Sequence, residues 1–179
     1  FLLLGHHYQD QAETFIIRQQ GQSGDLGLAC MSEKKSFFDG MMLRPFLGIF
    51  PQLLKDYNQQ MDIKWVEDPT NHTSEFMRGR LRQNLTREEI KNAFEMASLY
   101  GEKRKKFEKK VCYFFQQYLD FRPLGFAFLP ISSFDEDDVD VQSYALGEII
   151  RIIGGKAYAS DTKRLQAICF SIKNKNFRG

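Results

Sequence analysis

The feature that most restricts the fold of this chain is a long stretch without helix breakers. Between Arg87 and Asp120 the sequence contains no proline, and Gly101 is its only glycine. Proline removes a backbone donor and glycine costs conformational entropy, so their scarcity permits continuous helix. Thr86 precedes the stretch and Glu89 stands three residues later, which is the pattern of a capping box. We therefore predict one long helix here, or two in line.

The opening residues show the pattern of a strand followed by a helix. Phe1 to Leu4 is typical of a buried strand of a parallel sheet, and after two histidines a helical pattern covers residues 8–19. A strand followed by a helix is half of a βαβ unit. Such a strand needs neighbours that the sequence does not obviously supply, so we expect a fragment that begins inside a domain.

Further elements follow at intervals along the chain. Pro51 can occupy the first turn of a helix that reaches Asp62, Ile63 to Val66 alternates like a short strand, and 76–85 is helical in pattern. We expect a connector over 121–133 and helices over 139–153 and 161–173, the last capped by Ser160 or Asp161. The fold class is therefore α/β and then α, with an α/β domain over 1–85 and a helical domain over 86–179.

Composition excludes several classes of protein. With 42% hydrophobic and 27% charged residues and a net charge of +2, the 179 residues can bury a core. No apolar run approaches the roughly 18 residues of a membrane-spanning helix, so we predict no membrane role. Cys30, Cys112 and Cys169 are widely spaced and odd in number. They form neither a disulfide framework nor a Cys-x-x-Cys site, which favours a cytoplasmic location.

One group of residues next to the opening strand has side chains suited to catalysis or ligand binding. His6, Asp10 and Glu13 follow at i, i+4 and i+7, which places an imidazole and two carboxylates on one side of a helix start. Ligands of open α/β sheets bind at this end of the strands, and helix amino ends attract phosphate. The alternative is a capped helix with a solvated acidic face. A zinc site lacks a third nitrogen or sulfur ligand, so we assign no metal-ligating residues.

Five motifs, in order and spacing, resemble the tRNA(Ile)-lysidine synthetase family over about residues 1–85. They are His6-His7 with Asp10 to Thr14; Arg18, Ser23-Gly24 and Gly27 to Ala29; Leu43-Arg44-Pro45; Trp65 to Asn71; and Phe76, Arg78 and Arg80-Leu81-Arg82.

The resemblance implies a fold and an activity. The expected fold is part of a Rossmann-like ATP-pyrophosphatase domain, of the adenine nucleotide alpha hydrolase-like kind, followed by a helical domain that holds tRNA. Members of the family use ATP to adenylate the C2 carbonyl oxygen of the wobble cytidine of tRNA(Ile) with a CAU anticodon. The side-chain amine of free L-lysine then displaces AMP and gives lysidine. The implied cofactors are ATP and Mg²⁺, and a homodimer is one assembly the resemblance allows.

The resemblance also assigns roles to residues. His6, Asp10 and Glu13 match the active-centre motif, where a carboxylate positions Mg²⁺ or deprotonates the lysine ammonium. We expect cofactor binding by His7, Arg18, Ser23 and Gly24. We expect tRNA binding by Arg78, Arg80, Arg82, Lys103 and Arg104. The alternative for the arginines of 78–82 is pairing with Glu67 or Asp68, and we interpret Trp65, the only tryptophan, as core packing.

A basic stretch supports the expected contact with tRNA. From Arg78 to Lys110 there are eleven basic residues (78, 80, 82, 87, 91, 103, 104, 105, 106, 109, 110) and five acidic ones (88, 89, 95, 102, 108). Phosphate neutralisation dominates nucleic-acid affinity, so this run with its aromatic neighbours suits a tRNA surface. A solvated helix face balanced by the acidic residues of 135–140 is the equal alternative.

Two further expectations concern activity. The family's Gly-rich pyrophosphate loop lies upstream of the His-His motif and is not in this sequence, so we expect the parent protein to be the enzyme and this chain alone to be inactive in adenylation. The alternatives are a tRNA thiolation enzyme of the same superfamily, against which the absence of Cys-x-x-Cys counts, and a non-catalytic tRNA-binding remnant.

Overall fold

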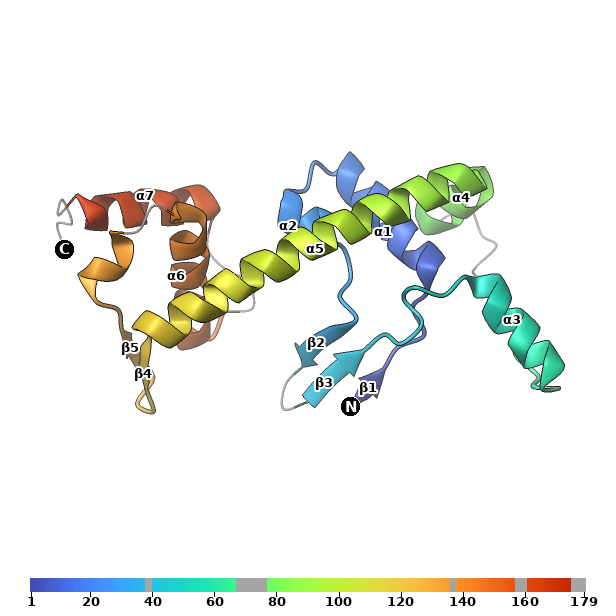
Figure 1. Ribbon diagram of the computed structural model, residues 1–179, viewed down its shortest axis with the longest axis horizontal. Coiled ribbons are helices and arrows are strands. Elements are labelled where there is room, and N and C mark those ends of the chain that lie inside the picture. The colour runs from blue at the N-terminus through green and yellow to red at the C-terminus, as the bar shows by residue number, and fades with distance from the viewer. Residues whose placement is uncertain (38–39, 67–76, 136–137, 157–160, 175–179) are drawn as a thin grey trace. The chain divides into compact units, whose positions relative to one another are not determined.

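The computed structural model describes residues 1–37, 40–66, 77–135, 138–156 and 161–174. The chain forms two compact units, Phe1–Arg104 and Lys105–Gly179, and helix α5 (Arg87–Tyr118) runs from the first into the second (Figure 1). The predicted long helix is thus confirmed as a single helix. The units divide inside α5, and the division into functional domains at 85 and 86 stays a prediction.

The predicted capping box also forms. The Thr86 backbone N donates to Glu89 Oε2 at 2.8 Å, and the Glu89 backbone N donates to Thr86 Oγ1 at 3.2 Å. Two amides at the start of α5 therefore have acceptors, which fixes where the helix begins.

The first unit contains a small mixed sheet. Its strands are β1 (Leu2–Leu3), β2 (Lys34–Phe37) and β3 (Gly40–Leu43), in the order β1-β3-β2. Strand β1 is parallel to β3, with Leu2 opposite Met42, and β2 is antiparallel to β3. The expected burial of the opening strand is wrong, because β1 lies at the edge of the described sheet and its leucines are 39% and 66% exposed.

Helix α1 (Tyr8–Gln20) follows β1 and carries the core of the first unit (Figure 1). Its residues Ala12 and Phe15 pack with Cys30 against Ala93 and Ala97 of α5. A short helix, α2 (Asp25–Leu28), lies between α1 and the sheet in sequence. The amino end of α1 is therefore held by packing against α5.

Two more helices complete the first unit. Helix α3 (Pro51–Gln60) has its proline at the predicted first turn, and α4 (Met77–Asn84) confirms the helix expected after Phe76, which itself lies outside the described residues. Residues 63–66 form no strand, which corrects the alternating-strand prediction. Ile63, Trp65 and Val66 are 48%, 45% and 93% exposed, so no strand among the described residues covers them.

The second unit is mainly helical but contains a hairpin. Strands β4 (Asp120–Arg122) and β5 (Phe126–Phe128) pair antiparallel, and Gly125 has the positive φ of 83° that their turn requires. This corrects the expectation of helices alone after residue 85, because the aromatic residues on both sides of Pro123 to Gly125 pair as strands.

The remaining elements are η2 (Ile131–Phe134), α6 (Val139–Ile153) and α7 (Thr162–Lys173). The two predicted helices are confirmed, and Asp161 caps α7 by accepting from the Arg164 backbone N at 3.1 Å. Val141 and Ala145 of α6 pack against Val111 and Phe114 of α5. Within the described residues, no helix combines the length and the apolar character that crossing a membrane requires.

Candidate functional site

A hollow of about 1020 Å³ lies in the first unit beside the amino end of α1. Two aromatic side chains, Phe50 and Trp65, and His7 line it. Four basic residues line it as well, namely Lys55, Arg82, Arg87 and Lys91. No carboxylate is among the described residues that line it. The hollow therefore suits an anion that carries a planar ring.

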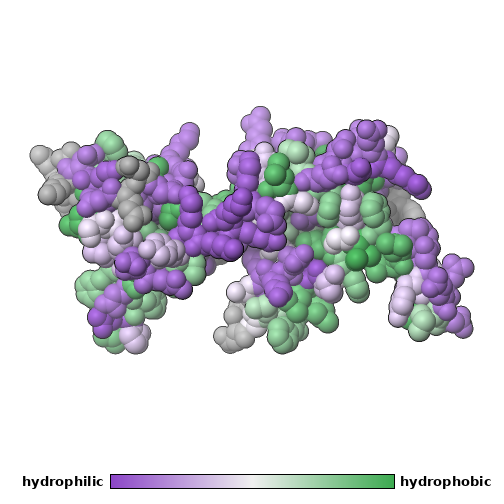
Figure 2. All heavy atoms as spheres, viewed as in Figure 1, coloured by the Kyte–Doolittle hydropathy of each residue, from purple (hydrophilic) through white to green (hydrophobic). Residues whose placement is uncertain are grey.

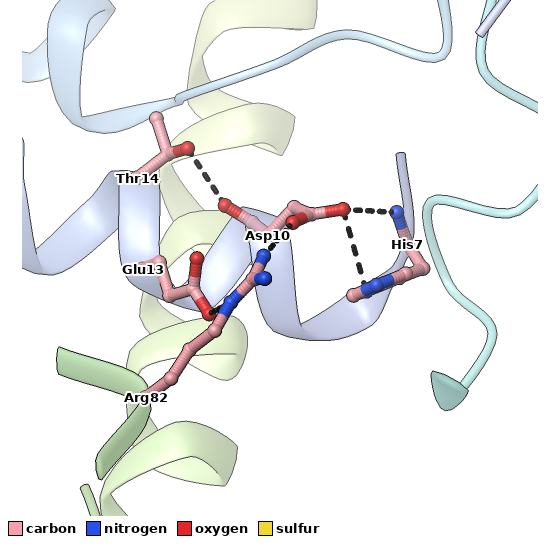
Figure 3. A network of polar contacts seen from close by, with 5 residues as sticks. All are labelled: His7, Asp10, Glu13, Thr14 and Arg82. Carbon is pink, nitrogen blue, oxygen red and sulfur yellow. Dashed lines mark hydrogen bonds and ion pairs between the residues drawn. The ribbon is translucent and has the colours of Figure 1, made fainter. Parts of the chain in front are cut away.

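The Arg82 guanidinium is held in place by two carboxylates of α1 (Figure 3). Its Nε donates to Glu13 Oε1 at 2.7 Å, and its Nη2 donates to Asp10 Oδ1 at 2.9 Å. The other oxygen of Asp10 accepts from the backbone N of His7 at 3.0 Å. Thr14 Oγ1 donates to the Asp10 carbonyl at 2.7 Å. This network fixes a cation at the wall of the hollow.

Burial sets the charges in this network. Glu13 has no exposed surface, and its Oε2 has no hydrogen-bond partner in the described part of the chain. Burial raises the pKa of Glu13, although Arg82 acts in the opposite direction. Burial also disfavours the Arg82 cation, but its bonds to Glu13 and Asp10 prevail and raise the pKa of Arg82. Arg82 is consequently a permanent cation.

His7 is the residue at the N-cap of α1, and its imidazole lines the hollow. Burial lowers its pKa, and Arg82 and His6 act in the same direction, while the Asp10 carboxylate 3.4 Å from Nδ1 acts against them. The ring is therefore neutral at neutral pH. A neutral imidazole that reaches a hollow can accept a proton there.

The structure rearranges the predicted group of His6, Asp10 and Glu13. Helix α1 begins at Tyr8, so His6 lies in the turn before it and takes no part in the network. Its neighbour His7 bonds Asp10 instead. The predicted common stripe on a helix start is wrong for His6, because His6 precedes the N-cap residue His7 and therefore lies outside the helix.

The two acids of that group are buried behind Arg82. Asp10 is 7% exposed and Glu13 0%, and neither lines the hollow. Their described contacts hold Arg82, which makes them positioning residues in this conformation. Among the described residues, no group of three or more His, Cys, Asp or Glu side chains could hold a metal ion.

The predicted cofactor-binding residues other than His7 lie together away from the hollow. Arg18 Nη1 donates to the Gly27 carbonyl at 2.7 Å, and the Ser23 backbone N donates to the Arg18 carbonyl at 2.9 Å. Gly24 is the N-cap of α2. A Cβ on Gly27 would lie 2.8 Å from the Ser23 Cβ, so this turn needs a glycine there. The three residues hold the connection between α1 and α2.

The predicted tRNA-binding arginines of α4 have different surroundings. Arg78 and Arg80 are exposed, whereas Arg82 is partly buried in the network with Asp10 and Glu13. The alternative partners Glu67 and Asp68 lie outside the described residues.

The basic run of α5 divides in the same way. Lys103 Nζ lies 3.7 Å from Asp25 Oδ2, and Arg104 Nη1 donates to the Cys30 carbonyl at 2.9 Å. In the second unit, Lys110 Nζ lies 2.7 Å from Asp138 Oδ2. Lys106 and Lys109 are exposed, and Figure 2 shows a hydrophilic surface along the middle of α5. Part of the run thus has acceptors within its own unit, and part faces solvent.

The structure adds residues that the sequence patterns did not indicate. Trp65 is 45% exposed and lines the hollow, so its interpretation as core packing is wrong. Lys55, Arg87 and Lys91 join it from α3 and α5. A signal existed for Trp65, which is a lone tryptophan shortly before a run of mainly polar residues within one of the resembling motifs. The three cations lie on different elements and share no local pattern.

Comparison with known proteins gives two consistent findings. Residues 1–89 match the model of the PP-loop domain family. A protein of Pseudomonas syringae pv. tomato named tRNA(Ile)-lysidine synthase is 39% identical over 84 residues, which are 47% of this chain and 19% of that protein. One of the same name from Xanthomonas campestris pv. campestris is 40% identical over 85 residues, 48% of this chain and 20% of its own length. The match spans about a fifth of each of these relatives.

Proposed function

We propose that this chain is part of an ATP-dependent enzyme that forms lysidine in tRNA(Ile), because residues 1–89 match the model of the PP-loop domain family. The similarity to proteins named tRNA(Ile)-lysidine synthase supports this choice within the family. The observation that carries it is the Arg82 guanidinium, which two buried carboxylates hold at the wall of a hollow lined by aromatic and basic side chains.

The proposed reaction has two steps. ATP transfers its adenylyl group to O2 of the wobble cytidine in the CAU anticodon, and pyrophosphate leaves. The amine of free L-lysine then attacks C2, the C2–O bond breaks, and AMP leaves with that oxygen. The new carbon–nitrogen bond gives lysidine, and the lysine amine releases its protons.

Residues of this chain have matching properties. The fixed Arg82 cation can bind the phosphate that becomes AMP, because a guanidinium pairs strongly with phosphate oxygens. The neutral His7 imidazole at the same hollow can take a proton from the lysine ammonium. Asp10 and Glu13 act in this proposal by orienting Arg82, and their direct catalytic role stays a prediction.

The two expected cofactors fit unequally. A nucleotide suits the hollow, where basic side chains face phosphate and aromatic rings face a base. The described residues form no Mg²⁺ site made of protein side chains alone, because Asp10 and Glu13 are bonded to Arg82 and no group of three or more His, Cys, Asp or Glu side chains among them could hold a metal ion. No step is therefore assigned to Mg²⁺.

The second unit is proposed to hold the tRNA. Lys106 and Lys109 are exposed on α5 with Tyr113, which is 62% exposed, at helical spacing. This arrangement supports contact with phosphates. A homodimer stays a prediction.

The properties of the cysteines speak against the thiolation alternative. Burial raises the pKa of Cys30 to about 11, although Arg18 and Arg104 act in the opposite direction. Cys169 is also buried and Cys112 is exposed, and all three are free thiols. A buried thiol with a raised pKa is a poor nucleophile for sulfur transfer.

The test measures incorporation of labelled lysine into tRNA(Ile) by the full-length protein. We expect incorporation that depends on ATP and on the CAU anticodon, and a loss of about 100-fold in Arg82→Gln, as for removal of one fixed donor from an active site. Lys35→Gln is the control and keeps its activity, because Lys35 is an exposed cation of β2 that does not line the hollow. No incorporation by the full-length protein would refute the proposal. The 179-residue chain alone is expected to give no tRNA-dependent ATP–pyrophosphate exchange.

A further inference from the structure

Trp65 presents an uncovered aromatic face to the hollow. It is 45% exposed, and in the described part of the chain it stacks on no other ring and makes no hydrogen bond. Covering a tryptophan ring removes a large apolar area from water, which is favourable. An exposed ring therefore leaves this free energy available to a ligand that covers it. Val66 beside it is 93% exposed, so this segment is not packed into the protein core.

The other aromatic wall of the hollow differs. Phe50 is 49% exposed, but its ring stacks on Tyr8 with centroids 4.0 Å apart. Tyr8 stacks in turn on Phe94 of α5 with centroids 3.8 Å apart. These three rings form a continuous stack, which fixes Phe50 as part of the fold. Trp65 is therefore the aromatic ring at the hollow that is left for a ligand.

The cations that line the hollow with Trp65 indicate that the ligand carries a negative charge. Arg87 and Lys91 lie one turn apart on α5 and line the same hollow. Lys91 approaches Glu95 only at 3.8 Å, and Arg87 forms no ion pair with the described residues. An exposed pair at that distance is weak and leaves the cation available. A planar group that stacks on indole and carries a phosphate is a nucleotide unit.

We propose that Trp65 is the stacking platform for a nucleobase whose phosphate contacts Arg87 and Lys91. The inference rests on the proposed function in placing a nucleotide at this hollow, and it adds the residue that binds the base. The base belongs either to a free adenine nucleotide or to an RNA strand. Both sources share the ring and the phosphate, and stacking is tolerant of base identity.

Trp65 is the only tryptophan of the chain, so its fluorescence reports on this site directly. The 179-residue chain is titrated with AMP, with an anticodon stem-loop that contains CAU, and with inorganic phosphate. We expect quenching that saturates with AMP or with the stem-loop, but not with phosphate. Quenching by AMP alone identifies the adenine nucleotide, and quenching by the stem-loop alone identifies the RNA base.

Variants separate stacking from a structural role. Affinity for the quenching ligand, measured by anisotropy of a labelled copy, is expected to fall about tenfold in Trp65→Leu and to be largely kept in Trp65→Phe, which retains a ring. Tyr57→Leu is the matched control, because Tyr57 is 57% exposed on α3 and does not line the hollow. Absence of quenching by both nucleotide ligands, or equal affinity of Trp65→Leu and Tyr57→Leu, overturns the inference.

This outcome is separable from that of the proposed function. Lysine incorporation by the full-length protein without quenching of Trp65 keeps the function and rejects the platform. Quenching without lysine incorporation keeps the platform and rejects the function.

Discussion

Arg82 Nε donates to Glu13 Oε1 at 2.7 Å although 69 residues separate the two in sequence. The same guanidinium bonds Asp10 at 2.9 Å, so one side chain of α4 joins two carboxylates of α1. Glu13 has no exposed surface and Arg82 is 28% exposed. The pair therefore anchors α4 to the buried side of α1 and presents a cation at the hollow.

Removing Arg82 is expected to destabilise the first unit. Arg82→Ala leaves the buried Glu13 carboxylate without its described partner, which costs about 3 kcal/mol of unfolding free energy for a pair buried on one side. Urea unfolding of the 179-residue chain, followed by circular dichroism, measures this change. Arg80→Ala is the control, since Arg80 is exposed on the same helix. Equal losses in the two variants would contradict the anchoring role.

The double variant Arg82→Ala with Glu13→Gln makes the same prediction more specific. The double variant removes the Glu13 charge together with Arg82. We therefore expect its loss of unfolding free energy to be smaller than the sum of the losses in the two single variants. Strict additivity would mean that Arg82 and Glu13 do not interact in solution.

The raised pKa of Glu13 predicts how stability depends on pH. The folded state binds the Glu13 proton more tightly than the unfolded state, whose carboxyl has the ordinary pKa of 4.5. The contribution of this group is therefore full below pH 4.5 and is lost as pH rises through the folded pKa. His7 acts oppositely, because its pKa is lowered from 6.5 and its contribution is lost as pH falls.

Comparison with Glu13→Gln isolates the acid from the histidine. Unfolding free energies of both proteins are measured between pH 4 and pH 7. We expect the unfolding free energy of the wild type, relative to that of the variant, to decrease as pH rises. An increase would show that pairing with Arg82 outweighs burial and lowers the Glu13 pKa.

Local signals in the sequence were sufficient for the six longer helices, α1 and α3 to α7, but not for the four-residue helices α2 and η2. The capping box of Thr86 and Glu89, the proline at the start of α3 and the aspartate cap of α7 each depend on residues within one turn, and all three are confirmed. Strand β2 escaped prediction because Lys34 to Ser36 is polar and pairs through its backbone. The hairpin of β4 and β5 likewise depends on pairing rather than on a strong apolar pattern.

The site could be predicted only in part, because it depends on distant contacts. The sequence indicated Asp10, Glu13 and Arg82 separately, but spacing within a helix cannot show that they bond one another. The exposure of Trp65 depends on what packs beside it in the folded unit, which composition does not reveal. The sequence indicated His6 rather than His7, because a difference of one residue at the N-cap decides which imidazole lies 3.4 Å from Asp10.

The cap of α5 should matter for stability. Thr86→Ala removes the acceptor for the Glu89 backbone N and is expected to cost about 1 kcal/mol of unfolding free energy. Ser98→Ala is the matched control, because Ser98 lies inside the same helix and its hydroxyl donates to the Phe94 carbonyl of that helix. Thermal or urea unfolding compares the two. A loss in Ser98→Ala as large as that in Thr86→Ala would show that hydroxyl removal, rather than capping, is responsible.

The division of the basic run predicts which lysines bind RNA. Lys106 and Lys109 are exposed, while Lys103 Nζ lies 4.7 Å from the centre of the Tyr100 ring as well as 3.7 Å from Asp25, and Lys110 Nζ lies 2.7 Å from Asp138. Each phosphate contact that is lost lowers the slope of log affinity against log salt by about 1. We expect Lys106→Gln with Lys109→Gln to weaken tRNA binding by the 179-residue chain and to reduce this slope by about 2.

Lys103→Gln with Lys110→Gln is the charge-matched control and should change the slope less. Filter binding at several salt concentrations measures both, and an equal reduction in the two variants would mean that net charge alone, not the exposed pair, governs affinity.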